Sequence, residues 1–379
     1  MKRIVVLGST GSIGVQTLDV VHRLAGRVEV VGLAAHRNTE VLARQARTFG
    51  VRRVCVADPA AAPALRRQLG DWRCDIREGM DGLNSVAALP EADTVVVAVA
   101  GAIGIAPTHS AITAGKHIAL ASKEVLVAAG EHTMALARRH GVTIVPIDSE
   151  HSALFQCLAG NPANGVAKLL LTASGGPFRN TPAEDMSQIT PEQALRHPTW
   201  TMGGLVTINS ATLMNKGLEI IEAHWLFGVP VSDIEVVVHP QSIVHSLVRF
   251  CDGSVLAQLG LPDMRLPIQY ALMYPERVDT GLPQLDLTRC GALTFESPDS
   301  SRFPALRLAR QAMEAGGTMP AVMNAANEAA VGRFLERRLP FTGIMITVEA
   351  VMRAHSPVEP SLTNVLKADQ WARARALSS

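Results

Sequence analysis

Short apolar runs alternate with amphipathic stretches through the first 150 residues. The apolar runs are typical of buried strands and occur at 2–7, 28–34, 51–57, 94–99, 117–121 and 142–147. The stretches between them, such as 38–49 and 131–140, carry apolar residues at helical spacing. Because strands that alternate with helices form a parallel sheet covered on both faces, we predict an α/β fold class. A Rossmann-type, doubly wound parallel sheet is expected over residues 1–149.

The pattern changes after residue 150. Strands are predicted at 168–172, 236–250 and 254–259, with a hairpin at Asp252-Gly253 joining the last two. Helical patterns follow at 262–274, 305–315, 319–336 and 346–355. We therefore predict a central α+β catalytic domain, a linker and a C-terminal helical domain. Their expected ranges are 150–274, including a flap at 197–204 and a dimerisation sheet, then 275–298 and 299–379.

Composition narrows the class of protein. A chain of 379 residues is too long for one ordinary core, and 47% hydrophobic with 18% charged residues fits a globular enzyme. The formal net charge of +1 gives no electrostatic reason to expect nucleic acid or an anionic membrane as partner. The N-terminus leads directly into a predicted strand, and no apolar run is long enough to span a bilayer. The five cysteines are scattered singly, which is typical of reduced thiols. We expect a cytoplasmic protein.

A glycine-rich turn, Gly8-Ser9-Thr10-Gly11-Ser12-Ile13-Gly14, follows the first strand and precedes a helical pattern. A strand, a glycine turn and a helix form the first unit of a dinucleotide-binding fold, in which the helix start faces the pyrophosphate. The spacing is GxxGxxG, and a simple strand-to-helix turn is the alternative. After the second strand, His36-Arg37-Asn38 occupies the position where an NAD-specific site carries an acidic residue. A cationic side chain there suits the 2′-phosphate of NADP, so the sequence favours NADP over NAD. An ordinary surface arginine is the alternative there.

Two carboxylates follow the strand at 142–147. In extended backbone, Asp148 and Glu150 would point to the same face, at the sheet edge where α/β folds bind ligands. Two clustered carboxylates either repel each other or share a cation, although an Asp/Ser/Glu helix cap also fits these residues. Lys123 follows the predicted strand at 117–121 and can stabilise developing negative charge, or can be a solvated helix-start lysine.

A second cluster of polar residues lies on the helical pattern at 209–224. At helical spacing, Asn215, Lys216 and Glu219 share one face, with Ser210 near the helix start. This face can bind a phosphate or a polyol. The alternative is a solvent-exposed helix surface that carries a Lys–Glu ion pair. Glu219 can complete a metal site with Asp148 and Glu150. Three carboxylates suit Mg²⁺ or Mn²⁺ better than Zn²⁺.

Two loops supply further candidates. Ser174-Gly175-Gly176 can form an anion nest from backbone N–H groups. The stretch His197-Pro198-Thr199-Trp200-Thr201-Met202-Gly203-Gly204 places large apolar groups between breakers, which is typical of a flap that excludes water. A tryptophan packed in an irregular loop is the alternative.

Seven motifs in order, GSTGSIG, ASKE, IDSEH, SGGPF, HPTWTMG, NSATLMNKGLE and HPQSIVHS, make the chain resemble the 1-deoxy-D-xylulose 5-phosphate reductoisomerase family of the non-mevalonate isoprenoid pathway. The likeness covers nearly the whole chain. It implies a homodimeric enzyme that makes 2-C-methyl-D-erythritol 4-phosphate by retro-aldol and aldol steps and a hydride transfer. It implies NADPH and a divalent cation as cofactors: Mg²⁺ or Mn²⁺, with Co²⁺ as a further candidate.

The resemblance also implies roles for individual residues. The metal ligands fall on Asp148, Glu150 and Glu219, and the catalytic set adds Lys123 and His197. The substrate-binding residues fall on Lys123, Ser149, Glu150, Ser174, His197, Trp200, Met202, Ser210, Asn215, Lys216 and Glu219. The cofactor-binding residues fall on Thr10, Gly11, Ser12, Ile13, His36, Arg37, Asn38, Ser122, Glu124 and Gly203. The chain departs from the family at His36, often Gly, and Ser122, usually Asn.

Two rivals stay open at this point. Another NADP-linked enzyme, such as a semialdehyde dehydrogenase, needs a nucleophilic cysteine, and none of the five cysteines has a suitable sequence context. A Rossmann-type binding module without chemistry would leave the carboxylate cluster without a purpose.

Overall fold

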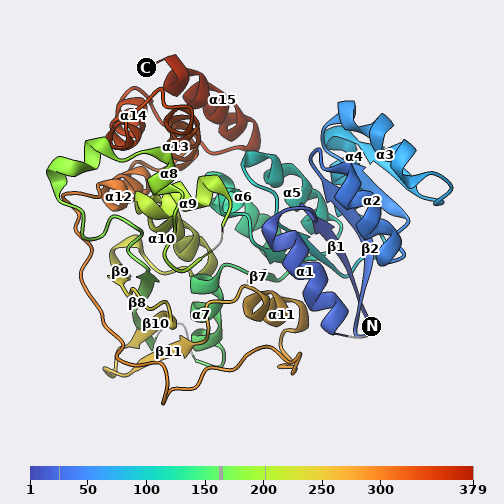
Figure 1. Cartoon of the computed structure of the whole chain (residues 1–379), viewed down its shortest axis with the longest axis horizontal. Helices are drawn as coiled ribbons and strands as arrows, with labels where there is room; N and C mark the ends of the chain where they lie inside the picture. Colours follow the sequence, from blue (N-terminus) through green and yellow to red (C-terminus); the bar gives the residue numbers. More distant parts are fainter. Residues whose placement is uncertain (25, 162–164, 201, 379) are drawn as a thin grey trace. The chain divides into compact units, whose positions relative to one another are not determined.

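The computed structural model describes residues 1–24, 26–161, 165–200 and 202–378 (Figure 1). Contacts within the chain divide it into two compact units. The first unit comprises Met1–Val125, Thr133–Ser152 and Asp263–Pro283; the second comprises Leu126–His132, Ala153–Pro262 and Gln284–Ser379. No helix among the described residues combines the length and the apolarity needed to cross a lipid bilayer.

The first unit is built on a seven-stranded parallel sheet, which confirms the predicted class. Its strands are β1 (Lys2–Leu7), β2 (Val28–Ala35), β3 (Arg53–Val56), β4 (Asp75–Glu78), β5 (Thr94–Val97), β6 (His117–Leu120) and β7 (Ile144–Pro146). They lie in the order β4-β3-β2-β1-β5-β6-β7. In the central strand β1, Ile4 to Leu7 are completely buried, as a strand covered on both faces requires. The strand order reverses beside β1, so ligands are expected at the carboxyl ends of β1 and β5.

The sequence analysis did not predict β4. Its residues, Asp-Ile-Arg-Glu, contain no apolar run, and the strand lies at one edge of the sheet. Edge strands tolerate charged side chains because only one side is paired, so hydrophobic periodicity gives little signal there.

Helices of the first unit are α1 (Ser12–Arg23), α2 (Thr39–Thr48), α3 (Ala62–Leu69), α4 (Gly79–Ala87), α5 (Ile105–Thr113) and α11 (Arg265–Met273). Two other helices, α6 (Lys123–His140) and α7 (Ser149–Leu158), contribute residues to both units. The helical pattern expected at 131–140 is the second half of the longer helix α6, which has a kink at Ala129, whose φ of −136° is not helical.

Helix α11 belongs to the first unit, whereas the predicted central domain, 150–274, included it. Arg265 donates to Asp263 and, at 3.1 Å, to Asp19 of α1. The Arg265–Asp19 pair joins residues 246 positions apart in the chain, and hydrophobic periodicity carries no information about such a long-range contact.

The second unit contains a four-stranded mixed sheet in the order β11-β10-β8-β9. Its strands are β8 (Val166–Ala173), β9 (Ile234–Val238), β10 (Val244–Phe250) and β11 (Val255–Leu259). The predicted hairpin is present between the antiparallel strands β10 and β11. The single strand predicted at 236–250 is wrong: the chain turns between β9 and β10, where Pro240 offers no N–H for a ladder and Ser242 has a φ of +51°.

Helices of the second unit are α8 (Pro191–Ala194), α9 (Gly204–Ala211), α10 (Met214–Phe227), α12 (Ala305–Ala315), α13 (Met319–Leu335), α14 (Phe341–Arg353) and α15 (Leu362–Ser378). The last four form the orange-to-red group in Figure 1. Three C-terminal helices were predicted and four are described. The sequence analysis missed α15 because its buried stripe is mainly alanine, at Ala368, Ala372 and Ala376. Within the predicted linker 275–298, the described chain forms one β-bridge, between Glu296 and Val238.

Candidate active site

The glycine turn after β1 is a tightly closed loop. A Cβ atom added to Gly14 would lie 2.2 Å from the carbonyl oxygen of Gly8, so only glycine fits. Ser9 and Gln45 of α2 exchange two hydrogen bonds, each 2.8 Å long, which hold the turn against α2. Gly11 is the N-cap of α1 and makes no side-chain capping bond. The turn therefore presents backbone at the start of α1, the geometry that suits a pyrophosphate.

Residues after β2 are arranged around the start of α2. Asn38 caps α2 by accepting a hydrogen bond from the backbone N–H of Val41. Arg37 is largely exposed, and its Nε donates to Asp58 at 2.5 Å. The N–H of Ala60 and the Arg37 guanidinium lower the pKa of the Asp58 carboxyl. A fixed guanidinium at this position is available to an anionic group on a ribose.

Lys123 and Asp148 meet because β6 and β7 are neighbours in the sheet. Lys123 begins α6 after β6, Asp148 follows β7, and the ammonium forms an ion pair with Asp148 Oδ2. Both side chains are more than four-fifths buried. Ser122, beside them, donates its hydroxyl proton to the carbonyl oxygen of Val99 at 2.5 Å, while Glu124 lies in the first turn of α6.

The backbone at Asp148–Glu150 differs from the prediction. It is not extended: Ser149 begins α7, and Asp148 Oδ1 accepts a hydrogen bond from the N–H of Glu150 at 3.2 Å. The capping alternative therefore describes Asp148 correctly. Ser149 donates to Glu150 Oε2 at 2.5 Å. The sequence analysis missed buried His151, whose Nδ1 lies 3.4 Å from Asp148 Oδ1; its place next to Glu150 was the only available signal.

In the second unit, three side chains from distant segments converge. His197 Nε2 lies 3.0 Å from the Ser174 hydroxyl and 3.1 Å from the Ser210 hydroxyl. The close approach depends on Gly176, which has a φ of +68° and whose added Cβ would lie 2.8 Å from the carbonyl oxygen of Ser210. Two serine hydroxyls and an imidazole therefore surround one point, a donor set suited to an anion.

The hydrogen bonds of His197 fix its tautomer. Its Nδ1 accepts the backbone N–H groups of Thr199, at 3.1 Å, and Trp200, at 2.8 Å. A neutral ring must then carry its proton on Nε2, which faces the two serine hydroxyls. Burial lowers the pKa of His197 from its ordinary value, because the charged imidazolium is less well solvated there.

The polar face of α10 is buried. Leu213, with a φ of +59°, precedes the helix, and Glu219 accepts hydrogen bonds from Asn215 and Lys216. Glu219 is 0% exposed and Lys216 is 3% exposed. The alternative of a solvated Lys–Glu pair is therefore wrong. A buried carboxylate that is held by an amide and an ammonium has a fixed orientation.

The predicted flap is a loop between α8 and α9. The ring of Trp200 lies 6.3 Å from the ring of His245 on β10, measured between centroids. Met202 is partly buried, and Gly203 is the exposed N-cap of α9. Thr201, within the predicted range 197–204, lies outside the described residues.

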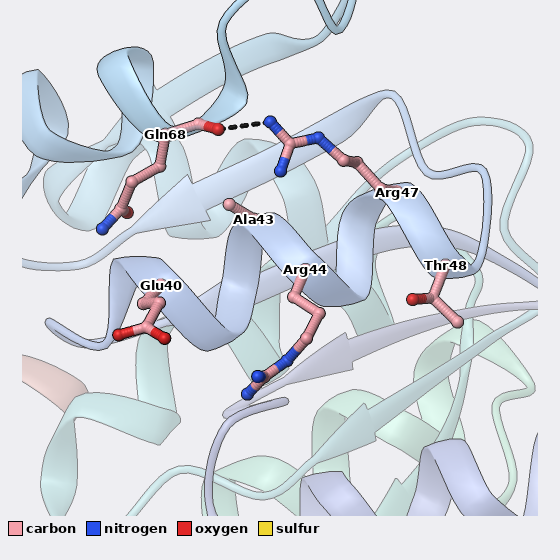
Figure 2. Close-up of a pocket in the computed structure, with 6 residues that line it drawn as sticks. All are labelled: Glu40, Ala43, Arg44, Arg47, Thr48 and Gln68. Atoms are coloured by element: carbon pink, nitrogen blue, oxygen red, sulfur yellow. Dashed lines mark hydrogen bonds between the residues drawn. The ribbon is translucent and has the colours of Figure 1, made fainter.

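A separate pocket of about 360 Å³ lies between α2 and α3 in the first unit. Figure 2 shows Glu40, Arg44 and Arg47 on α2, with the Arg47 guanidinium bonded to the carbonyl oxygen of Gln68. The pocket includes none of the predicted site residues, and the Arg47 guanidinium already donates to the backbone carbonyls of Gln68 and Leu69.

The doubly wound sheet and the glycine turn define the first unit as a Rossmann-type nucleotide-binding fold. The second unit adds partly buried hydroxyl, imidazole and amide groups and the buried ammonium of Lys216. Family models for 1-deoxy-D-xylulose 5-phosphate reductoisomerase match residues 4–130, and models for the C-terminal domains of this enzyme match 144–227 and 259–375. The chain belongs to the 1-deoxy-D-xylulose 5-phosphate reductoisomerase family.

Individual relatives agree over nearly the full length. The 1-deoxy-D-xylulose 5-phosphate reductoisomerase of Symbiobacterium thermophilum is 58% identical over 98% of this chain and 97% of its own. The Zymomonas mobilis enzyme in complex with NADPH is 43% identical, with a TM-score of 0.93. A structure of the enzyme with NADPH, fosmidomycin and magnesium is 39% identical, with a TM-score of 0.95. Both structures cover 100% of this chain, which covers 98% of each.

Proposed function

We propose that this chain converts 1-deoxy-D-xylulose 5-phosphate to 2-C-methyl-D-erythritol 4-phosphate, using NADPH and a divalent cation. The observation that carries this proposal is family membership over nearly the whole chain, at up to 58% identity. Solved relatives that align with the full chain hold NADPH and magnesium. The reaction supplies precursors for isoprenoid biosynthesis.

NADPH is proposed to bind along the carboxyl ends of β1, β2 and β5. The backbone of Thr10, Gly11, Ser12 and Ile13, at the start of α1, suits the pyrophosphate. Arg37 and Asn38 suit the 2′-phosphate, with His36 beside them. Ser122, Glu124 and Gly203 complete the proposed cofactor set.

Three carboxylates, Asp148, Glu150 and Glu219, are proposed to hold the cation. The donor set fits a hard ion, because all three offer oxygen atoms and each is already oriented by hydrogen bonds within its own unit. A bound Mg²⁺ or Mn²⁺ supplies positive charge that stabilises negative charge on substrate oxygens. Lys123, paired with Asp148, is proposed to donate to the same oxygens.

The phosphate of the substrate is proposed to bind in the second unit. Ser174, Ser210 and the Nε2–H of His197 face one point, and Asn215 and Lys216 lie on the following helix. Contacts to a phosphate remote from the reacting carbons fix the pose of the substrate. Trp200 and Met202 are proposed to cover the bound substrate and exclude water, which would otherwise reach the reactive fragments.

The two buried cysteines give no support to the rival dehydrogenase. Burial raises the pKa of Cys55 to about 12 and that of Cys157 to about 11, so neither thiol is an activated nucleophile.

A spectrophotometric assay tests the proposed function. The purified full chain is mixed with 1-deoxy-D-xylulose 5-phosphate, Mg²⁺ and either NADPH or NADH, with and without a chelator. We expect NADPH oxidation that stops when the chelator is added and returns with excess Mg²⁺. Oxidation that persists in chelator, or an absence of turnover with all components present, would contradict the proposal.

Arg37→Ala is expected to weaken the preference for NADPH. Loss of the guanidinium removes a charged partner of the 2′-phosphate, so KM for NADPH rises about tenfold while KM for NADH stays within about twofold. Steady-state kinetics with both cofactors measure the effect. Arg44→Ala is the matched control, because Arg44 is an exposed arginine on the adjacent helix α2. Equal increases in both KM values would contradict the assignment.

We further propose that the enzyme works as a cytoplasmic homodimer whose subunits pair through β11. This strand lies at the edge of its sheet, and Val255 and Leu256 are 47% and 43% exposed. An edge strand with exposed apolar residues can extend its ladder with a second copy. Sedimentation of the wild type and of Leu256→Lys tests the dimer: we expect the variant to shift towards the monomer.

The predicted three-part division is retained as a proposal for function. Residues 1–149 are proposed to bind NADPH, 150–274 to carry most substrate contacts, and 299–379 to support them, with 275–298 as linker.

A further inference from the structure

A pair of buried asparagines connects the C-terminal helices to the proposed phosphate site. Asn327 Nδ2, on α13, donates to Asn209 Oδ1, on α9, at 2.9 Å. Asn327 is 0% exposed and Asn209 is 4% exposed. Asn209 directly precedes Ser210, whose hydroxyl lies 3.1 Å from His197 Nε2. The hydrogen bond therefore acts one residue away from a proposed phosphate ligand.

Helix α9 needs such a tertiary contact to hold its position. It is eight residues long, starts at Gly203-Gly204, and has no side-chain capping bond at its N-terminus. Helices of this length are unstable alone, and the two glycines at the start of α9 weaken it further. A directional bond to a longer helix fixes both the depth and the rotation of α9, which apolar packing alone does not.

The position of Ser174 in the proposed phosphate site depends on the same helices. Phe178, which follows the Ser174-Gly175-Gly176 turn, packs edge-to-face on Phe341 of α14, with ring centroids 5.3 Å apart. Phe341 in turn contacts Phe334 of α13 at 5.7 Å. The C-terminal helices thus anchor the Ser174 loop by aromatic packing and the Ser210 helix by a hydrogen bond.

We propose that Asn327 is a positioning residue for the substrate phosphate. Through Asn209 it fixes the Ser210 hydroxyl opposite Ser174, so that both hydroxyls meet the phosphate at the same time. The inference rests on the proposed function, because it takes the anion to be the phosphate of 1-deoxy-D-xylulose 5-phosphate. It gives the C-terminal helices a direct part in substrate affinity, beyond that of a scaffold.

Asn327→Leu, in the full chain, is the primary test. Leucine matches the size of asparagine but cannot donate, so Asn209 Oδ1 loses its partner. We expect KM for the substrate to rise about tenfold, inorganic phosphate to bind about tenfold more weakly by calorimetry, and KM for NADPH to stay within about twofold. The matched control is Asn324→Leu: Asn324 is 1% exposed on the same helix, but its amide donates to Glu328 of α13 itself.

Asn209→Leu and the double variant Asn209→Leu/Asn327→Leu complete a cycle. The double variant removes both polar partners, so it is expected to fold at least as well as either single variant and to weaken phosphate binding no more than Asn327→Leu does. If Asn327→Leu does not fold, the phosphate affinity of the double variant is measured in its place. Multiplicative effects of the two substitutions, an unchanged phosphate affinity in Asn327→Leu, or an equal loss in Asn324→Leu would each overturn the inference.

The phosphate titration separates this inference from the proposed function. If the wild type binds inorganic phosphate but does not turn over 1-deoxy-D-xylulose 5-phosphate, the proposed function fails. The role of Asn327 at the anion site is then still decided by the titration of the variants.

Discussion

Glu219→Gln is expected to reduce kcat about 1000-fold at saturating substrate and NADPH, and to weaken Mn²⁺ binding. The substitution preserves the shape of the side chain and its contact with Asn215 but removes the charge that is proposed to hold the cation. It also leaves the Lys216 ammonium, 3% exposed, without the carboxylate that it contacts. Steady-state kinetics over a range of Mg²⁺ concentrations and titration with Mn²⁺ measure the two effects.

Glu328→Gln is the control for the loss of a partly buried glutamate's ion pair away from the proposed metal site. Glu328 lies on α13, is 12% exposed and pairs with Arg373 at 2.7 Å. We expect this variant to lose stability but to keep wild-type kcat and Mn²⁺ affinity. Near-normal turnover of Glu219→Gln at low Mg²⁺ would remove Glu219 from the proposed metal site.

Gly14→Ala is expected to destabilise the first unit by about 3 kcal/mol and to weaken NADPH binding more than tenfold. The new methyl group would lie 2.2 Å from the carbonyl oxygen of Gly8 and 2.5 Å from Ser9 Cα. Both are backbone atoms, so the turn itself must move, and the start of α1 moves with it. Chemical denaturation gives the free energy of unfolding, and fluorescence titration gives the Kd for NADPH.

Gly11→Ala is the matched control in the same turn. Its added Cβ would lie 3.4 Å from the same carbonyl oxygen, and its φ is −79°. We expect a free energy of unfolding within about 0.5 kcal/mol of the wild type. If Gly14→Ala were as stable as Gly11→Ala, the close approach would not be what requires glycine in this turn.

Several features of the site could be predicted from the sequence because their chemistry is local. The glycine turn, the capping position of Asp148, and the helical spacing of Asn215, Lys216 and Glu219 each involve residues within a few positions of one another. Local spacing also gave an error: Asp148 and Glu150 were expected on extended backbone, but α7 begins between them at Ser149. Their i, i+2 spacing does not distinguish a strand end from a helix start.

Long-range contacts could not be predicted from periodicity. The meeting of Ser174, His197 and Ser210 depends on the way Gly176 lets two segments approach, and the spacing of these residues gives no sign of it. The position of α11 in the first unit depends on ion pairs between Arg265 and the distant Asp19. Helix α15 was missed because alanines at every fourth position pack closely but give a weak hydrophobic signal.

The order of apolar and polar residues by itself determined the alternation of strands and helices, and hence the parallel sheet. The reason is that strands and helices repeat their buried side chains at different intervals along the sequence. Only the tertiary structure decided that the polar face of α10 is buried and that Asn327 reaches Asn209 across 118 positions. The burial of a side chain and the identity of its hydrogen-bond partner depend on how the chain packs. A lysine next to a glutamate on a helix has the same sequence whether it faces water or the protein interior.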